Sequence, residues 1–133
     1  MGGVQLATKE ELEMIRDSCL LPMLLDVVEK QRKKMERTNQ PLKALFLATN
    51  EHLLDLIHED LVEIRRQLKH ADIKVWALHE KTSEAAIWYR YKCRGYQNDF
   101  GIMHFVIKTD LQIKLGKYVA RAEMGLSRVH SLK

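Results

Sequence analysis

The chain has 133 residues, 46% hydrophobic and 30% charged, which is typical of one soluble globular domain rather than of a disordered segment. Six Gly and two Pro are too few turn-forming residues for a many-stranded sandwich or barrel. The longest apolar run, 19–25, contains Pro22 and falls far short of the roughly 20 residues that span a bilayer. With no secretory leader pattern and no disulfide framework, we expect a cytoplasmic protein without membrane contact.

The net charge of +4 is distributed unevenly along the chain. Residues 1–71 hold 11 Lys and Arg against 12 Asp and Glu, a net charge of −1. Residues 72–133 hold 11 against 6, a net charge of +5. The excess therefore lies where the hydrophobic periodicity also changes, which directs the search for a partner-binding surface to the C-terminal half.

Two helical segments are expected before residue 38. Thr8 and Glu11 form a capping box, which satisfies exposed amides at a helix start. Pro22 lacks an amide hydrogen, and the apolar seam changes phase beyond it. We therefore predict a kinked first helix made of two pieces, 9–20 and 22–37.

A long second helix is predicted over 41–70, after a turn at 38–41. Its apolar residues recur every three or four positions, and a straight helix of this length extends about 45 Å. Such a helix either bends or packs partly against a second copy of the chain. A homodimer through this helix would use the centre of the seam, including an asparagine that can fix register: Asn50, Leu53, Ile57 and Leu61.

Residues 72–108 are rich in branched and aromatic side chains and predict an antiparallel three-stranded meander, with strands at 73–80, 85–94 and 102–108. A last helix is expected over 109–124, followed by a loose tail, 125–133. With the helical layer at 8–70, these elements form one α+β domain over 1–133, in which a helical hairpin packs on the sheet.

The middle strand places one set of alternating side chains on an apolar face and the other on a basic face. We predict that this basic face binds nucleic acid or an acidic protein, because cations meet phosphates and rings stack on bases. The face comprises Trp88, Arg90, Lys92 and Arg94, extended by His104 and Lys108 of the third strand. A solvated polar face with no partner is the alternative. The preferred strand register pairs Trp76 with Tyr89 and keeps Lys74 off this face.

Other polar clusters have simpler explanations. Lys114, Lys117 and Arg121 form a cationic stripe on the last helix and are further candidate contacts. The basic run 30–34 stabilises a helix C-terminus through its dipole. His52 and its acidic neighbours lack zinc spacing and match a solvated helix face. No nucleophile motif or phosphate loop is present, so we expect no cofactor, no metal and no catalytic residue.

The element order gives two topological comparisons. The α-β-β-β-α order over about 52–124 resembles double-stranded-RNA-binding domains, and helices followed by three strands and a helix resemble small messenger-cleaving toxins. The leading hypothesis is a non-enzymatic regulatory protein that binds its partner, nucleic acid first, through the sheet. The alternatives are a ribonuclease acting from the same face, with Tyr89, Tyr91 and His104 beside the cations, and a self-associating adaptor.

Overall fold

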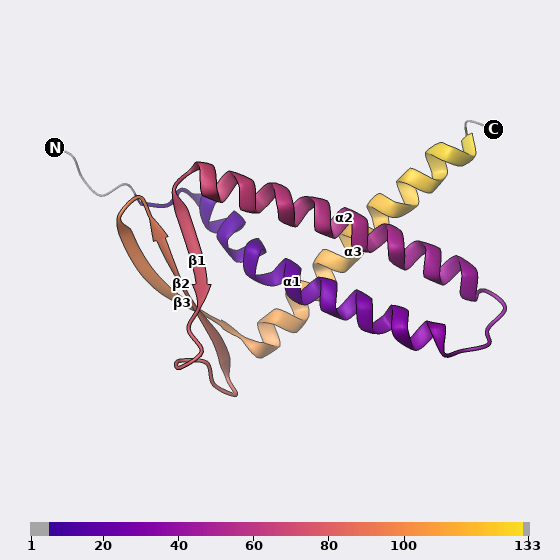
Figure 1. Cartoon of the computed structure of the whole chain (residues 1–133), viewed down its shortest axis with the longest axis horizontal. Helices are drawn as coiled ribbons and strands as arrows, with labels where there is room; N and C mark the ends of the chain where they lie inside the picture. Colours follow the sequence, from indigo (N-terminus) through magenta and orange to yellow (C-terminus); the bar gives the residue numbers. More distant parts are fainter. Residues whose placement is uncertain (1–5, 132–133) are drawn as a thin grey trace.

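The chain folds as three long helices and one three-stranded antiparallel sheet, which confirms the α+β prediction. The computed structural model describes residues 6–131, with side chains over 6–124. Helices α1 and α2 run side by side, the sheet lies at one end of this pair, and α3 crosses them (Figure 1). No helix in this part of the chain is both long and apolar enough to cross a membrane. The elements are α1 (Lys9–Glu36), α2 (Lys43–His70), β1 (Ile73–Ala77), β2 (Ala86–Cys93), β3 (Tyr96–Met103) and α3 (His104–Ser131).

Helix α1 begins at the predicted capping box. The Glu11 amide donates to the Thr8 hydroxyl at 3.1 Å, and the Thr8 amide donates to the Glu11 carboxylate at 2.9 Å. The predicted break at residue 21 is wrong, because the helix continues through Pro22 to Glu36. Pro22 has no N–H to donate to the carbonyl of Ser18, so this missing bond is tolerated inside a helix that the packing on both sides holds together.

The seam of α2 is buried within the chain itself. Leu53, Ile57 and Leu61 pack against α1 and against Tyr118 of α3, and Ile57 is 0% exposed. The prediction that these three side chains form a self-association surface is therefore wrong, since α1 and α3 already cover them. Asn50, one turn earlier, is half-buried.

The second and third strands meet in a turn that the sequence analysis missed. Arg94 and Gly95 have φ values of +48° and +95°, and Cys93 pairs directly with Tyr96. Positive φ at both central residues is the signature of a tight type I′ hairpin. The third strand is therefore Tyr96–Met103 rather than 102–108, and the polar segment assigned to a loop is an edge strand.

Helix α3 follows β3 without a loop and starts earlier than predicted. His104 is its first residue, and the His104 amide donates to the Ala85 carbonyl at 3.0 Å. His104 and Lys108 thus lie on a helix, and their predicted place on a third strand is wrong. The helix continues to Ser131, so most of the expected tail is helical, while residues 132–133 of that tail lie outside the described residues.

The register of β1 against β2 differs from the preferred one by one residue. Trp76 lies opposite Arg90 rather than Tyr89, and Lys74 lies opposite Lys92. The connection between the strands spans 78–85 instead of the predicted 81–84, so the loop-length argument for the register fails. One residue of slip exchanges the two faces of a strand. Lys74 and Trp76 therefore share the outer face with Arg90 and Lys92, and Trp76 is 39% exposed.

The inner face of the sheet packs against the helices in two neighbouring apolar clusters. Ile73, Tyr91 and Cys93 pack against Ile15 of α1 and Leu68 of α2. A neighbouring cluster links α1, β3 and the start of α3 through Leu20, Ile102 and Ile107. The sheet is consequently fixed at the end of the α1–α2 pair, with β1 and β3 at its two edges.

Candidate anion-binding cleft and the outer face of the sheet

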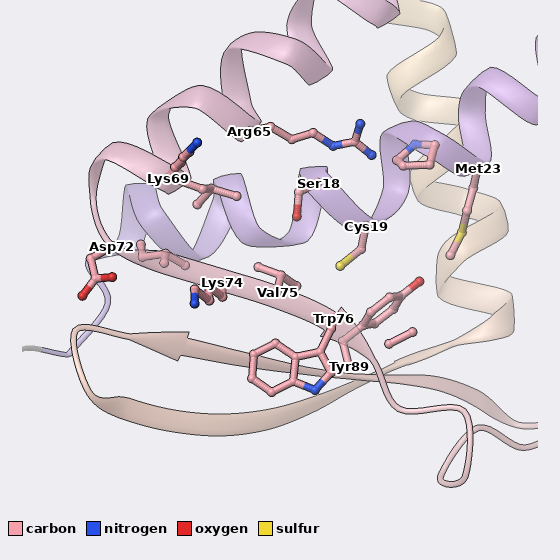
Figure 2. A pocket seen from close by; sticks show the side chains of 14 residues that line it. Ser18, Cys19, Met23, Arg65, Lys69, Asp72, Lys74, Val75, Trp76 and Tyr89 are labelled. Atoms are coloured by element: carbon pink, nitrogen blue, oxygen red, sulfur yellow. The ribbon is translucent and has the colours of Figure 1, made fainter.

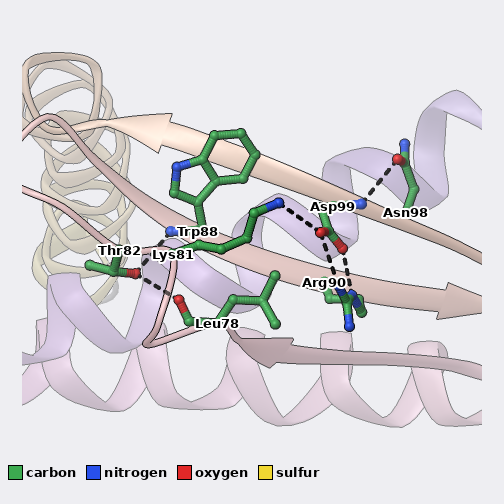
Figure 3. A network of polar contacts seen from close by, with 7 residues as sticks. All are labelled: Leu78, Lys81, Thr82, Trp88, Arg90, Asn98 and Asp99. Atoms are coloured by element: carbon green, nitrogen blue, oxygen red, sulfur yellow. Dashed lines mark hydrogen bonds and ion pairs between the residues drawn. The ribbon is translucent and has the colours of Figure 1, made fainter.

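Arg90, the centre of the predicted basic face, forms an ion pair within the sheet. Its Nε donates to Asp99 Oδ1 at 2.5 Å, and its Nη2 donates to Asp99 Oδ2 at 3.0 Å (Figure 3). Lys81 donates to the same carboxylate at 3.0 Å. Hydrogen bonds from Arg90 and Lys81 hold the pKa of Asp99 well below its usual range. Arg90 is thus engaged by a cross-strand ion pair, but it shares the single Asp99 carboxylate with Lys81, so one positive charge of this group remains uncompensated.

Trp88 lies flat on the outer face beside this ion pair. A Cβ atom added to Gly101 would stand 2.8 Å from Trp88 Cε2, so only glycine on β3 allows the indole to lie against the backbone. The Lys81 ammonium stands 4.7 Å from the centre of the Trp88 ring system. The indole is therefore half-buried and lies in contact with both Gly101 and the Lys81 ammonium.

Arg94 does not belong to the outer face, and its predicted place there is wrong. It donates through both terminal nitrogens to the Glu11 carboxylate at 2.9 Å, and also to the carbonyls of Leu6 and Ala71. Its positive φ in the hairpin turns the side chain toward the start of α1. The Arg94 hydrogen bond, followed by that of Thr8, lowers the pKa of Glu11 to about 2. Arg94 thus connects the hairpin, α1 and the end of α2.

Lys74 and Lys92 are cations of the outer face that form no ion pair among the described residues. They are cross-strand partners, both are exposed, and neither contacts an acidic side chain in the described part of the chain. Like charges directly opposite each other on a sheet repel and destabilise the pair. This arrangement favours an anion from outside the chain near β1.

The cationic stripe of α3 is used mainly for helix packing. Lys114 forms an ion pair with Asp17 of α1, and Arg121 donates to Asp60 of α2 at 2.7 Å. Tyr118 donates to the same Asp60 oxygen at 2.7 Å. Lys117 is exposed, and Lys108 lies near the start of α3. The predicted contact residues are therefore not brought together: Trp88, Arg90 and Lys92 share the sheet surface, whereas the α3 cations lie elsewhere.

A cleft of about 660 Å³ lies between α1, the end of α2 and the edge strand β1 (Figure 2). All five residues of β1, 73–77, line it. Helix α1 contributes Cys19, Pro22 and Met23, and α2 contributes Leu68. The volume falls within the range of small-ligand sites, and the lining is mostly apolar.

The polar groups of the cleft are predominantly positive. Arg65 and Lys69 lie one helical turn apart on α2, and Lys74 lies on β1. Asp72 is the acidic residue among the lining side chains. Within residues 6–124, no ion pair engages Arg65, Lys69 or Lys74. Three unpaired cations around an apolar floor suit a ligand that is anionic and partly apolar.

The ionisable groups of the cleft floor remain neutral at physiological pH. Burial raises the pKa of the Cys19 thiol to about 11, although Ser18 and Arg16 act in the opposite direction. Burial also raises the pKa of Tyr89 to about 12. A thiol with a raised pKa is a poor nucleophile. The floor therefore contributes apolar contact, and the charge of the site comes from Arg65, Lys69 and Lys74.

Sequence reasoning missed Arg65 and Lys69 because it searched for cations in the C-terminal half. Both residues lie in the half whose net charge is −1. The available signal was their position beside the apolar seam residue Leu68 in the last turns of α2. Only two residues separate α2 from β1, so the end of the helix and the strand that follows it must lie close together. The correct β1 register was also needed to add Lys74.

The groups proposed for a ribonuclease do not converge. Tyr89 and Tyr91 lie on the inner face, and Tyr91 is buried, whereas Arg90 and Lys92 lie on the outer face. His104 instead approaches the Ser83 carbonyl at 3.2 Å. Among the described residues, no three His, Cys, Asp or Glu side chains are grouped as a metal site would require.

A comparison with protein-family models finds one family that matches most of this α+β chain. The family model described as YhjD protein matches residues 6–123, which include every element of the fold up to the last turns of α3. The chain belongs to the YhjD protein family. No curated protein and no solved structure matched the chain.

Proposed function

We propose that this chain is a small cytoplasmic binding protein without catalytic activity, and that its partner is anionic and docks at the cleft beside β1. The observation that carries this proposal is the convergence of Arg65, Lys69 and Lys74, unpaired within the described residues, on a largely apolar cleft of about 660 Å³. Buried and paired cations stabilise a fold, whereas unpaired cations beside a cavity attract anions and accelerate their association.

An acidic protein segment is the favoured partner class. Nucleic acid is bound mainly through many phosphate contacts. Arg90 and Arg94 carry internal partners, which leaves Lys74 and Lys92 as the unpaired cations of the outer face. A protein segment offers apolar side chains for the floor formed by Met23, Pro22 and Val75 as well as carboxylates for its rim.

Single-stranded nucleic acid is the second candidate, and its support is the outer face. Trp76 and Trp88 both lie on it, with Lys74 and Lys92 between them and the hairpin. Indole rings provide stacking surfaces for unpaired bases, and lysines contact phosphates. This surface shares Lys74 and Trp76 with the cleft but does not include Arg65 or Lys69, so substitutions of Arg65 and Lys69 separate the two candidates.

The test is a titration of the full chain with two anionic probes, a glutamate-rich peptide and a single-stranded RNA, at 50 and 200 mM salt. Trp76 lies both in the cleft and on the outer face, so tryptophan fluorescence reports binding of either probe, and the variants below assign the site. The double variant Arg65→Glu/Lys69→Glu is expected to weaken peptide binding by on the order of 10-fold or more. The control is Lys30→Glu/Lys34→Glu, which makes the same charge change on α1 away from the sheet. Equal affinities for the two double variants would reject the cleft as the site.

A further inference from the structure

The edge of β1 that faces away from β2 presents backbone groups with no hydrogen-bond partner in the part of the chain that the structure describes. The Leu78 amide donates to the Trp88 carbonyl at 2.8 Å, and the Arg94 amide donates to the Asp72 carbonyl at 3.1 Å. Hydrogen-bonded pairs alternate along an antiparallel ladder. Lys74 and Trp76 therefore direct their N–H and C=O groups toward β2, while Val75 and Ala77 direct theirs away from it.

These outward groups belong to residues that line the cleft. Val75 and Ala77 are half-buried, and within residues 6–131 no hydrogen bond reaches their N–H or C=O groups. Figure 2 shows β1 running along the cleft, with Arg65 and Lys69 on the helical side. An unpaired edge is a template for one more strand. The cleft thus combines directional backbone groups with unpaired cations.

We infer that the cleft binds an extended acidic segment of another protein by strand addition to β1. This inference rests on the proposed function, because it takes the anionic ligand of the cleft and specifies how it binds. The backbone of the segment pairs with Val75 and Ala77, its apolar side chains contact the floor at Cys19 and Met23, and its carboxylates meet Arg65, Lys69 and Lys74.

Repulsion between like charges disfavours a second copy of the chain as the strand that pairs with this edge. Two β1 strands paired edge to edge would bring the same unpaired lysines and arginine of both copies together. Like charges across an interface disfavour the contact. An acidic strand instead compensates Arg65 and Lys69, and it relieves the repulsion between Lys74 and Lys92 on the neighbouring pair of strands.

The test uses a short peptide of alternating glutamate and valine and two N-methylated forms of it, measured by calorimetry against the full chain. One form carries methyl groups on the glutamate amides and the other on the valine amides. The three peptides share sequence and charge. In strand addition only every second residue hydrogen-bonds the edge. For a given direction of the added strand the alternation fixes which set does so, because a one-residue slip exchanges the faces.

Strand addition predicts that one methylated form loses at least about 10-fold in affinity while the other binds like the parent peptide. Equal affinities of the two methylated forms, with binding still weakened by Arg65→Glu/Lys69→Glu, would overturn strand addition and leave the anion-binding cleft in place. Absence of binding by the parent peptide at 50 mM salt would overturn both. If the Val75 and Ala77 amides already exchanged their hydrogens slowly in the free protein, the β1 edge would be paired without the peptide. This result would also overturn the inference.

Discussion

The apolar seam of α2 and the edge of β1 differ in how far the rest of the described chain covers them. The seam at Leu53, Ile57 and Leu61 is fully covered by α1 and α3. The edge at Val75 and Ala77 keeps backbone donors and acceptors without partners in the described chain. Apolar side chains can be buried by any apolar neighbour, because the hydrophobic effect is not directional. Backbone groups of an edge strand need a partner with the matching geometry.

The cations also divide into those with partners inside the chain and those without a partner among the described residues. Arg94 and Arg90 are paired with Glu11 and Asp99 and connect elements that are distant in sequence or adjacent in the sheet. In the described part of the chain, Arg65, Lys69 and Lys74 form no ion pair, although Asp72 also lines the cleft. The comparison therefore separates a closed part of the molecule, which determines stability, from an open part, which is available for binding. The following substitutions test this separation.

The largest effect is expected from Ile57→Ala in the closed part. Ile57 is fully buried, and truncation leaves a cavity between three helices, so the free energy of unfolding should fall by about 3 kcal/mol. Urea unfolding measures this value, and sedimentation measures the mass. Val62→Ala, at an exposed position of the same helix, is the control and should change little. If Ile57→Ala changed the mass of an oligomer and left monomer stability intact, the seam would be an interface after all.

The second largest effect on the free energy of unfolding is expected from the ion pair between Glu11 and Arg94. Glu11→Gln keeps an oxygen for the helix cap but removes the charge, and should cost about 1.5 kcal/mol at pH 7. The folded pKa of Glu11, about 2, is lower than its usual 4.5, so its stabilisation is present above pH 4.5 and is lost as the pH falls toward 2.

Urea midpoints at pH 7 and pH 3 test this dependence. The difference between the original chain and Glu11→Gln should shrink at the lower pH. Glu13→Gln, an exposed neighbour on α1, is the matched control. A difference that stays constant across this range would show that the Glu11 charge does not stabilise the fold.

Proline substitutions on β1 test which backbone groups are open. Lys74→Pro removes an amide that pairs with β2, whereas Val75→Pro removes one that faces the cleft. Lys74→Pro should therefore cost about 1 kcal/mol more in the free energy of unfolding. Thermal unfolding of the two variants gives the order. The reverse order would contradict the derived alternation of the ladder.

The smallest effect on stability is expected in the open part. Arg65→Glu/Lys69→Glu breaks no ion pair of the described chain but removes a cation from the last turn of α2, so the free energy of unfolding should fall by less than about 1 kcal/mol. The same double variant should lose affinity for the acidic peptide. A loss of stability comparable to that of Glu11→Gln would show that these cations are part of the closed region.

Local features of the fold could be predicted from the sequence, and pairings between distant segments could not. The capping box at Thr8 and the seam of α2 depend on spacings of three and four residues, which the sequence displays directly. The third strand was misplaced because the tight turn is at Arg94–Gly95. Asp99 and Gly101 resemble loop residues, but on β3 Asp99 pairs with Arg90 and Gly101 contacts the Trp88 ring.

The candidate site was predicted in part for the same reason. Alternation placed Trp88, Arg90 and Lys92 on one face, and the structure has them there. It could not show that Asp99 would lie opposite Arg90, or that Glu11 would take Arg94, because both acids come from other elements. Arg65 and Lys69 acquire their role only when α2 and β1 are placed side by side.

Residue-resolved amide hydrogen exchange tests the central claim most directly. The full chain is measured alone and with the alternating glutamate–valine peptide. Exchange at Val75 and Ala77 should be fast in the free chain and slow strongly when the peptide is present, while the Lys74 and Trp76 amides, which already bond to β2, should change little. Unchanged exchange at Val75 and Ala77 at saturating peptide would contradict an open β1 edge that accepts an acidic strand.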